Sequence, residues 1–195
     1  MEHMGKLIGV GVWLMVMITG AGRSWAEPLS SLSLDDVRWE IVNDTVMGGK
    51  SWSQLTPSQG SLIFSGYLNT NGGGFASMRS QRLEVDLAAA ATLRLRVRGD
   101  GRQYGIRLYT AGERASYQHR FRTLAGEWQW VNVRLSDFDA TWRGRRLDRP
   151  PLIAGDIVAL GLILADGIDG NFAVELDQLE FLAEPAGRGG WSEVL

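Results

Sequence analysis

The stretch Leu93-Arg94-Leu95-Arg96-Val97-Arg98 alternates apolar and basic side chains with a period of two. Successive side chains of a β-strand point to opposite faces, so this pattern predicts a strand with one buried and one wet face. Gly99-Asp100-Gly101-Arg102 follows as a turn cluster, and Tyr104, Ile106 and Leu108 resume the alternation. We therefore expect residues 93–110 to form a β-hairpin.

Strand patterns recur along the rest of the chain. Alternation or short apolar runs predict strands at 39–42, 51–55, 61–68, 75–80, 117–122, 128–135 and 157–165. In a further strand at 172–181 the apolar parity changes near Asp177, which predicts a β-bulge. Only 32–37 and 86–91 could form a turn or two of helix. About nine or ten short strands with glycine-rich turns predict an all-β fold, a β-sandwich or jelly roll.

The amino-acid composition excludes several classes of protein. The 195 residues carry a net charge of −2, and 45% of them are hydrophobic, which suits one globular domain. This charge argues against a strongly basic nucleic-acid-binding protein. The sequence has no cysteine, which excludes a disulfide scaffold, a Cys-ligated metal and a thiol nucleophile.

The N-terminus has the pattern of a secretory signal. Lys6 precedes an uncharged stretch over 7–22, and small residues stand at Ser24 and Ala26. The uncharged stretch is shorter than the roughly 20 residues that span a bilayer. We expect a signal peptide over 1–26, a domain over 27–182 and a loose tail over 183–195. The protein would then be exported, periplasmic or secreted, and not an integral membrane protein after cleavage.

Candidates for catalysis and metal binding are few. His119 is the single histidine after residue 26, it lies within a predicted strand, and no catalytic motif accompanies it. We therefore expect no enzyme activity, no catalytic residues and no cofactor. The loop Asp166-Gly167-Ile168-Asp169-Gly170-Asn171 offers oxygen ligands but lacks the spacing of a calcium loop. We expect no metal site, and calcium binding would identify Asp166 and Asp169 as ligands.

Two glycine-containing motifs stand out. The first is Asn43-Asp44-Thr45-Val46-Met47-Gly48-Gly49, and the second is Gly72-Gly73-Gly74-Phe75-Ala76-Ser77-Met78-Arg79. Each joins a turn to a strand and uses glycines where other residues resist the backbone shape. We expect the two motifs to meet, with Arg79 hydrogen-bonded to Asp44 or to carbonyls of the 43–49 loop, and Met47 facing a partner.

These motifs resemble the signature of the complex I intermediate-associated protein 30 family. The similarity extends over about residues 35–182, through Gly99–Tyr104, Trp128–Phe138, Leu160-Gly161 and Asp169–Phe172. The resemblance implies a galactose-binding-like jelly roll. It also implies a role in assembling NADH:ubiquinone oxidoreductase by binding subunits and partner factors. On this basis the expected partner-binding residues are Asn43, Asp44, Thr45, Val46, Met47, Gly48, Gly49, Gly74, Phe75, Ser77 and Arg79.

Two function hypotheses remain. The first is a non-enzymatic protein-binding module, with a membrane or respiratory complex subunit as the partner. The alternative is a glycan-binding module of the cell envelope, because sugars stack on exposed aromatic rings. The candidate rings are Trp52, Trp128, Trp130, Trp142 and Tyr109, although core packing is the stronger expectation for Trp128 and Trp130. A groove lined by aromatics would favour a glycan, and an apolar patch around Val46 and Met47 would favour a protein.

Overall fold

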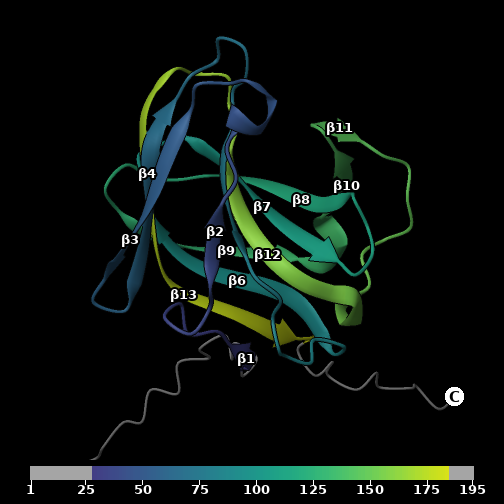
Figure 1. The fold of residues 1–195 in the computed structure, drawn as a ribbon. Helices are drawn as coiled ribbons and strands as arrows, with labels where there is room; N and C mark the ends of the chain where they lie inside the picture. The colour runs from purple at the N-terminus through teal and green to yellow at the C-terminus, as the bar shows by residue number, and fades with distance from the viewer. Residues whose placement is uncertain (1–27, 185–195) are drawn as a thin grey trace, which may run out of the picture.

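The computed structural model describes residues 28–184, and its regular secondary structure is almost entirely β-strand (Figure 1). The predicted signal peptide over 1–26 lies outside the described residues, as does the predicted tail beyond residue 184. Two antiparallel sheets pack face to face, which confirms the predicted all-β sandwich.

The strands divide between sheet A and sheet B. Sheet A has the order β3-β4-β13-β6-β9, with β1 also paired to β13, and sheet B has the order β11-β10-β8-β7-β12-β5-β2. The strands of sheet A are β1 (Pro28–Ser31), β3 (Trp52–Ser58), β4 (Ser61–Leu68), β6 (Ala90–Arg98), β9 (Trp128–Arg134) and β13 (Gly170–Ala183). Those of sheet B are β2 (Trp39–Ile41), β5 (Ala76–Ser80), β7 (Gln103–Thr110), β8 (Ser116–Arg122), β10 (Asp139–Trp142), β11 (Arg145–Arg146) and β12 (Ile157–Leu164). Three short 3-10 helices connect strands: η1 (Asp44–Met47), η2 (Leu135–Asp137) and η3 (Ala154–Asp156).

The core fills the space between the two sheets, because each strand alternates inward apolar and outward polar side chains. Sheet A contributes rings such as Phe64 and Phe172, whose centroids are 5.0 Å apart. Sheet B contributes Tyr104, which is fully buried and donates its hydroxyl hydrogen to Asp100. Other fully buried side chains of the core are Leu68, Met78, Leu93, Leu108, Leu164, Leu176 and Phe181.

The predicted hairpin over 93–110 is wrong. β6 pairs with β9 and β13 in sheet A, whereas β7 pairs with β8 and β12 in sheet B. The connection 99–102 therefore crosses between the sheets instead of reversing within one. Asp100 fixes this crossing, because its carboxylate accepts hydrogen bonds from the hydroxyl of Tyr104 at 3.0 Å and the N–H of Ala173 at 2.9 Å. Turn composition predicted a reversal but not which sheet the next strand would join.

Other predictions for the elements are confirmed or corrected in detail. The register between β13 and β6 shifts between Leu176 and Gln178, which confirms the bulge predicted near Asp177. β12 lies inside sheet B between β7 and β5, as its apolar run indicates. The segments 32–37 and 86–91 contain turns and no helix. Residues 28–184 form thirteen strands instead of nine or ten, because β1, β10 and β11 were not predicted.

The outer face of sheet A carries a ladder of ion pairs. Arg94, Arg96 and Arg98 of β6 pair with carboxylates of β13 at 2.5, 3.0 and 2.5 Å, the partners being Glu180, Asp177 and Glu175. On their other side the arginines approach Trp130 and Trp128 of β9, with guanidinium carbons 4.5–5.1 Å from the ring centroids. Core packing of these two tryptophans was therefore the wrong prediction, and Trp130 is 43% exposed.

Candidate functional site

The two glycine-containing motifs meet around the carboxylate of Asp44. Asp44 opens η1 and is completely buried. One carboxylate oxygen accepts the N–H of Ser51 at 2.9 Å, and the other accepts the Ser51 hydroxyl at 2.6 Å and the N–H of Gly74 at 2.7 Å. Within the described part of the chain, no basic side chain bonds to this carboxylate. Burial alone would raise the pKa of Asp44, but these hydrogen bonds hold it below its ordinary value.

Two glycines make room for this carboxylate. A Cβ on Gly49 would lie 2.2 Å from the Asp44 carboxyl carbon, and one on Gly73 would lie 2.3 Å from its oxygen. Both glycines are therefore required by close approach to a side chain.

A second set of contacts joins the start of the loop to β3, to β5 and to Phe75 just before β5. The side-chain oxygen of Asn43 accepts the hydroxyl of Ser53 at 2.9 Å and the N–H of Ser77 at 3.4 Å. The Ser77 hydroxyl donates to the carbonyl of Val42, and the N–H of Asp44 donates to the carbonyl of Phe75 at 3.1 Å. The predicted meeting of the two motifs is thus confirmed.

The predicted bond from Arg79 to this loop is wrong. Arg79 stacks on Tyr109, with its guanidinium carbon 3.9 Å from the ring centroid, and no hydrogen bond among the described residues joins it to 43–49. The reason is the register of sheet B, in which Arg79 lies opposite Gly161 of β12. Because Gly161 has no side chain, Arg79 can extend across β12 onto Tyr109 of β7. The partners of Asp44 are instead backbone N–H groups and the Ser51 hydroxyl.

The outer side of the same loop is exposed and apolar. Val46 is 69% exposed and Met47 is 59% exposed, and Thr45 and Gly48 beside them are also exposed. Gly48 closes η1 with a φ of 86°, which favours glycine. The hydrogen bonds of Asp44 therefore fix a loop on which the apolar side chains of Val46 and Met47 are exposed to solvent.

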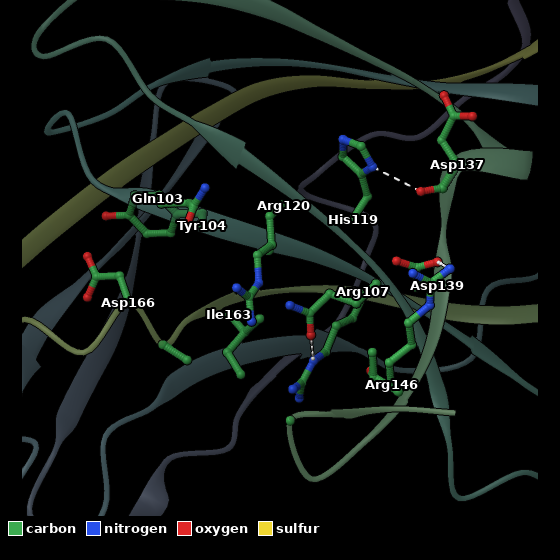
Figure 2. Close-up of a pocket in the computed structure, with 15 residues that line it drawn as sticks. Gln103, Tyr104, Arg107, His119, Arg120, Asp137, Asp139, Arg146, Ile163 and Asp166 are labelled. Carbon is green, nitrogen blue, oxygen red and sulfur yellow. Dashed lines mark hydrogen bonds and ion pairs between the residues drawn. The ribbon is translucent and has the colours of Figure 1, made fainter. Parts of the chain in front are cut away.

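A groove crosses the outer face of sheet B beside this loop. It consists of two adjoining cavities of about 580 and 410 Å³, both lined by Arg107, Thr141, Gly144, Ile163 and Ala165. The larger cavity carries mostly polar side chains, of which Arg107, Arg120, His119 and the Asp139–Arg146 pair appear in Figure 2. The smaller cavity is more apolar and is lined by Met47, Gly74 and Phe75 of the motifs together with Tyr109 and Trp142.

The floor of the groove includes Gly105 of β7. A Cβ on Gly105 would lie 2.8 Å from the Gln118 amide nitrogen, so the floor is closely packed at this position. Arg107 and Arg120 flank this floor, with Arg107 opposite Gln118 and Arg120 opposite Gly105 in the β7–β8 pair. Sequence reasoning missed these groove arginines. The outward parity of the two predicted strands was the signal that could have identified them.

The residues that the sequence offered for catalysis or metal binding, His119, Asp166 and Asp169, each bond to a neighbouring group of the protein. His119 donates from Nδ1 to the carbonyl of Asp137 at 3.0 Å, and its ring lies 5.9 Å from that of Phe138. Asp166 forms a two-bonded ion pair with Arg102 at 2.6 and 2.9 Å. Burial would raise the pKa of Asp166, but the bonds and charge of Arg102 lower it. Asp169 instead accepts the N–H of Thr70 at 2.6 Å.

The proposed calcium ligands Asp166 and Asp169 are thus committed to different partners. Across residues 28–184 there is no grouping of three or more His, Cys, Asp or Glu side chains that could hold a metal ion. Over the same residues no helix is both long and apolar enough to cross a membrane.

Comparison with known proteins identifies a family match. The sequence profile of the complex I intermediate-associated protein 30 family matches residues 28–176. The protein of that name from Mus musculus is 27% identical over 174 residues, covering 76% of this chain and 53% of its own length. The Drosophila melanogaster protein is 30% identical over 178 residues, covering 77% of this chain and 60% of its own length. The chain thus spans about half the length of the curated relatives it matches.

Solved structures with the same fold are distant in sequence. The family 11 carbohydrate-binding module of a Clostridium thermocellum cellulosomal cellulase superposes with a TM-score of 0.57 at 15% identity, covering 81% of this chain and 94% of that one. An agarase superposes with a TM-score of 0.58 at 12% identity, covering 83% of this chain and 25% of its own. At this level of identity the similarity establishes the jelly-roll fold alone.

The predicted export to the periplasm or the exterior is wrong. The matched relatives from Mus musculus, Caenorhabditis elegans and Drosophila melanogaster are all named as mitochondrial proteins. A signal-like pattern of charge and hydropathy does not by itself identify the compartment.

Proposed function

Because the chain belongs to the complex I intermediate-associated protein 30 family, we propose that it is a non-enzymatic module that holds a subunit of a respiratory complex during assembly. The observation that carries this proposal is the exposed Val46–Met47 pair on a loop fixed by a buried hydrogen-bond network. Exposed apolar side chains on a preorganised loop suit protein binding, since little ordering entropy is lost on association.

The expected partner-binding residues have two roles in this proposal. Thr45, Val46, Met47 and Gly48 are exposed and would touch the partner. The others hold the loop or the groove wall beside it: Asn43, Asp44, Gly49, Gly74, Phe75, Ser77 and Arg79. The one histidine of the described chain is bonded to a backbone carbonyl, which supports a role without catalysis.

Crosslinking from the loop tests the proposal directly. A photoreactive amino acid placed at Met47 should capture a respiratory complex subunit in the organism that encodes the chain. The matched control places it at Gln54, which is exposed on sheet A. Deleting the gene should also lower the amount of assembled NADH:ubiquinone oxidoreductase on native gels.

Complementation separates loop binding from folding. Val46→Ser combined with Met47→Ser should fail to restore assembly, whereas Leu124→Ser, at a residue 52% exposed elsewhere, should restore it. Normal assembly in the deletion strain, or full rescue by the double variant, would rule out the proposal.

Glycan binding is a second candidate, favoured by one observation. Tyr109, Trp142 and Phe75 line the smaller cavity of the groove, and aromatic rings are the usual platform for sugars. Calorimetric titration with mixed-linkage β-glucan and agaro-oligosaccharides tests it. Saturable binding that Trp142→Ala abolishes would support this second function.

A further inference from the structure

We propose that the groove of sheet B binds an acidic, extended segment of the partner polypeptide. This inference rests on the proposed function, because it names the chemistry of the partner segment that would lie beside the Val46–Met47 loop. It also rests on the groove arginines that have no ion pair within residues 28–184, on the position of two of them at its floor, and on the difference between its polar and its apolar cavity.

The groove has more positive charge than its own carboxylates can neutralise. Asp139 pairs with Arg146 at 2.7 Å, Asp137 with Arg134 at 3.3 Å and Asp166 with Arg102 at 2.6 Å. The remaining lining arginines have no carboxylate within 4.0 Å among residues 28–184, and these are Arg107, Arg114, Arg120 and Arg143. Such a surface attracts anionic ligands and repels cationic ones.

Arg107 and Arg120 are placed to hold carboxylates on the groove floor. Arg107 donates from Nε to the side-chain oxygen of Gln118 at 3.1 Å, which fixes the guanidinium while its terminal amino groups make no hydrogen bond within the described chain (Figure 2). Arg120 is exposed on the neighbouring strand β8, on the same face of sheet B, and lies opposite Gly105 of β7. A planar guanidinium donates two parallel hydrogen bonds to one carboxylate. Two such groups on one face of the sheet suit alternate acidic side chains of an extended segment, which share one face.

The other end of the groove suits an apolar anchor. Met47, Phe75, Tyr109 and Trp142 line the cavity of about 410 Å³, which continues from the arginine-lined cavity through the shared residue Arg107. Arg114 and Arg143 also line this cavity. A ligand that fills both cavities would therefore carry a large apolar group at this end and negative charge along its length. A polypeptide segment with acidic residues and one aromatic or aliphatic residue has this chemistry.

The aromatic rings themselves favour a polypeptide over a neutral sugar. One face of Tyr109 is covered by the guanidinium of Arg79 at 3.9 Å, and Arg143 lies 5.5 Å from the ring centroid of Trp142. Sugars need open ring faces, whereas rings bordered by guanidinium groups accept apolar side chains edge-on and carboxylates beside them.

Titration with defined probes tests the inference. The first probe is a capped octapeptide of glutamates and aspartates ending in Leu-Phe, and its control replaces every acid by the corresponding amide. An oligosaccharide of uronic acids, neutral β-glucan and vesicles containing phosphatidylglycerol complete the panel. The acidic peptide should bind more tightly than every other probe, and its affinity should fall as salt concentration rises.

Two matched double variants locate the binding. Arg107→Gln with Arg120→Gln should weaken the acidic peptide about tenfold or more. Arg82→Gln with Arg122→Gln removes the same charge outside the groove lining and should weaken it less than about twofold. Arg107→Lys with Arg120→Lys, which keeps the charge without the paired donors, should fall between them.

Several outcomes would overturn the inference. Equal binding of the amide peptide, equal loss in both glutamine double variants, or tighter binding of a saccharide or of vesicles each contradicts an acidic polypeptide ligand. The complementation assay then separates the two proposals. If Val46→Ser with Met47→Ser fails to restore assembly but Arg107→Gln with Arg120→Gln restores it, the groove inference fails while the proposed function stands.

Discussion

Asp44 is a buried carboxylate whose charge is balanced by three hydrogen-bond donors from two separate chain segments, at Ser51 and at Gly74. Removing one partner of such a group leaves the others unsatisfied, which costs more than the lost bond alone. The loop that presents Val46 and Met47 therefore depends on a single side chain beneath it.

Substituting Asp44 should reveal this dependence through pH. The pKa of Asp44 is lowered in the folded state, so its stabilising contribution is complete above the ordinary value of 3.8 and is lost as pH falls through the folded value. We expect Asp44→Asn to reduce the free energy of unfolding by about 2–3 kcal/mol at pH 7, because amide hydrogens then face the donors of Ser51 and Gly74. Urea unfolding should show this difference shrinking below about pH 4.

The control for this measurement is Asp35→Asn, at an exposed position. Its effect should stay within about 0.5 kcal/mol at every pH. A difference between wild type and Asp44→Asn that does not change with pH would contradict the assigned role of the charge.

The glycines around Asp44 give a second test at the residue scale. Gly49→Ala and Gly73→Ala each add a Cβ within 2.3 Å of the Asp44 carboxyl group, so each should destabilise the protein by about 1–3 kcal/mol. Gly155→Ala adds a Cβ at ordinary contact distance, 3.6 Å from Ala88, and should be nearly neutral. Thermal unfolding of the three variants checks the contrast, and equal melting temperatures would refute it.

At the scale of elements, Arg102 connects the crossing between the sheets to the turn before β13. It pairs with Asp166 and donates to the carbonyls of Gly170 and Asn171 at 3.3 and 3.1 Å. The side chains of Arg102 and Asp166 are only 11% and 6% exposed. Their interaction is therefore only weakly screened by water.

A double-mutant cycle should measure this connection. Arg102→Gln leaves Asp166 buried without its charge partner and should cost about 3–5 kcal/mol. Asp166→Asn should also destabilise, and the double variant should cost clearly less than the sum of the two. Additive effects in urea unfolding would indicate that the pair does not act as a unit.

The sequence predictions were accurate where a feature depends on residues close together in the chain, and they failed where it depends on pairing between distant strands. Alternation located β4, β8 and the bulge in β13, because burial on one face imposes period two locally. A continuous apolar run located β12, which is buried on both faces. It could not decide that β6 and β7 belong to different sheets, since that depends on pairing with strands far along the chain. The motifs around Asp44 were found by their unusual composition. Their partner was misassigned to Arg79 because the register of β5 against Gly161 is not visible in sequence.

At the scale of the whole molecule, both ends of the described chain meet in sheet A. β1 pairs with the end of β13, with Pro28 opposite Leu182, and β13 also pairs with β4 and β6 (Figure 1). The strand nearest the C-terminal end of the described residues is thus the centre of the sheet. Without it, β4 is left paired only to β3, and β6 only to β9.

This topology constrains folding during synthesis on the ribosome. A nascent chain that ends at residue 169 holds every strand except β13, yet sheet A is then divided into two strand pairs with open edges. Such edges are prone to wrong pairing, and contacts of long sequence separation form slowly. We expect stalled nascent chains ending at residue 169 to remain sensitive to protease, and chains extended past residue 184 by a linker to become resistant in one step. Gradual protection before β13 has emerged would show that the sandwich folds by halves.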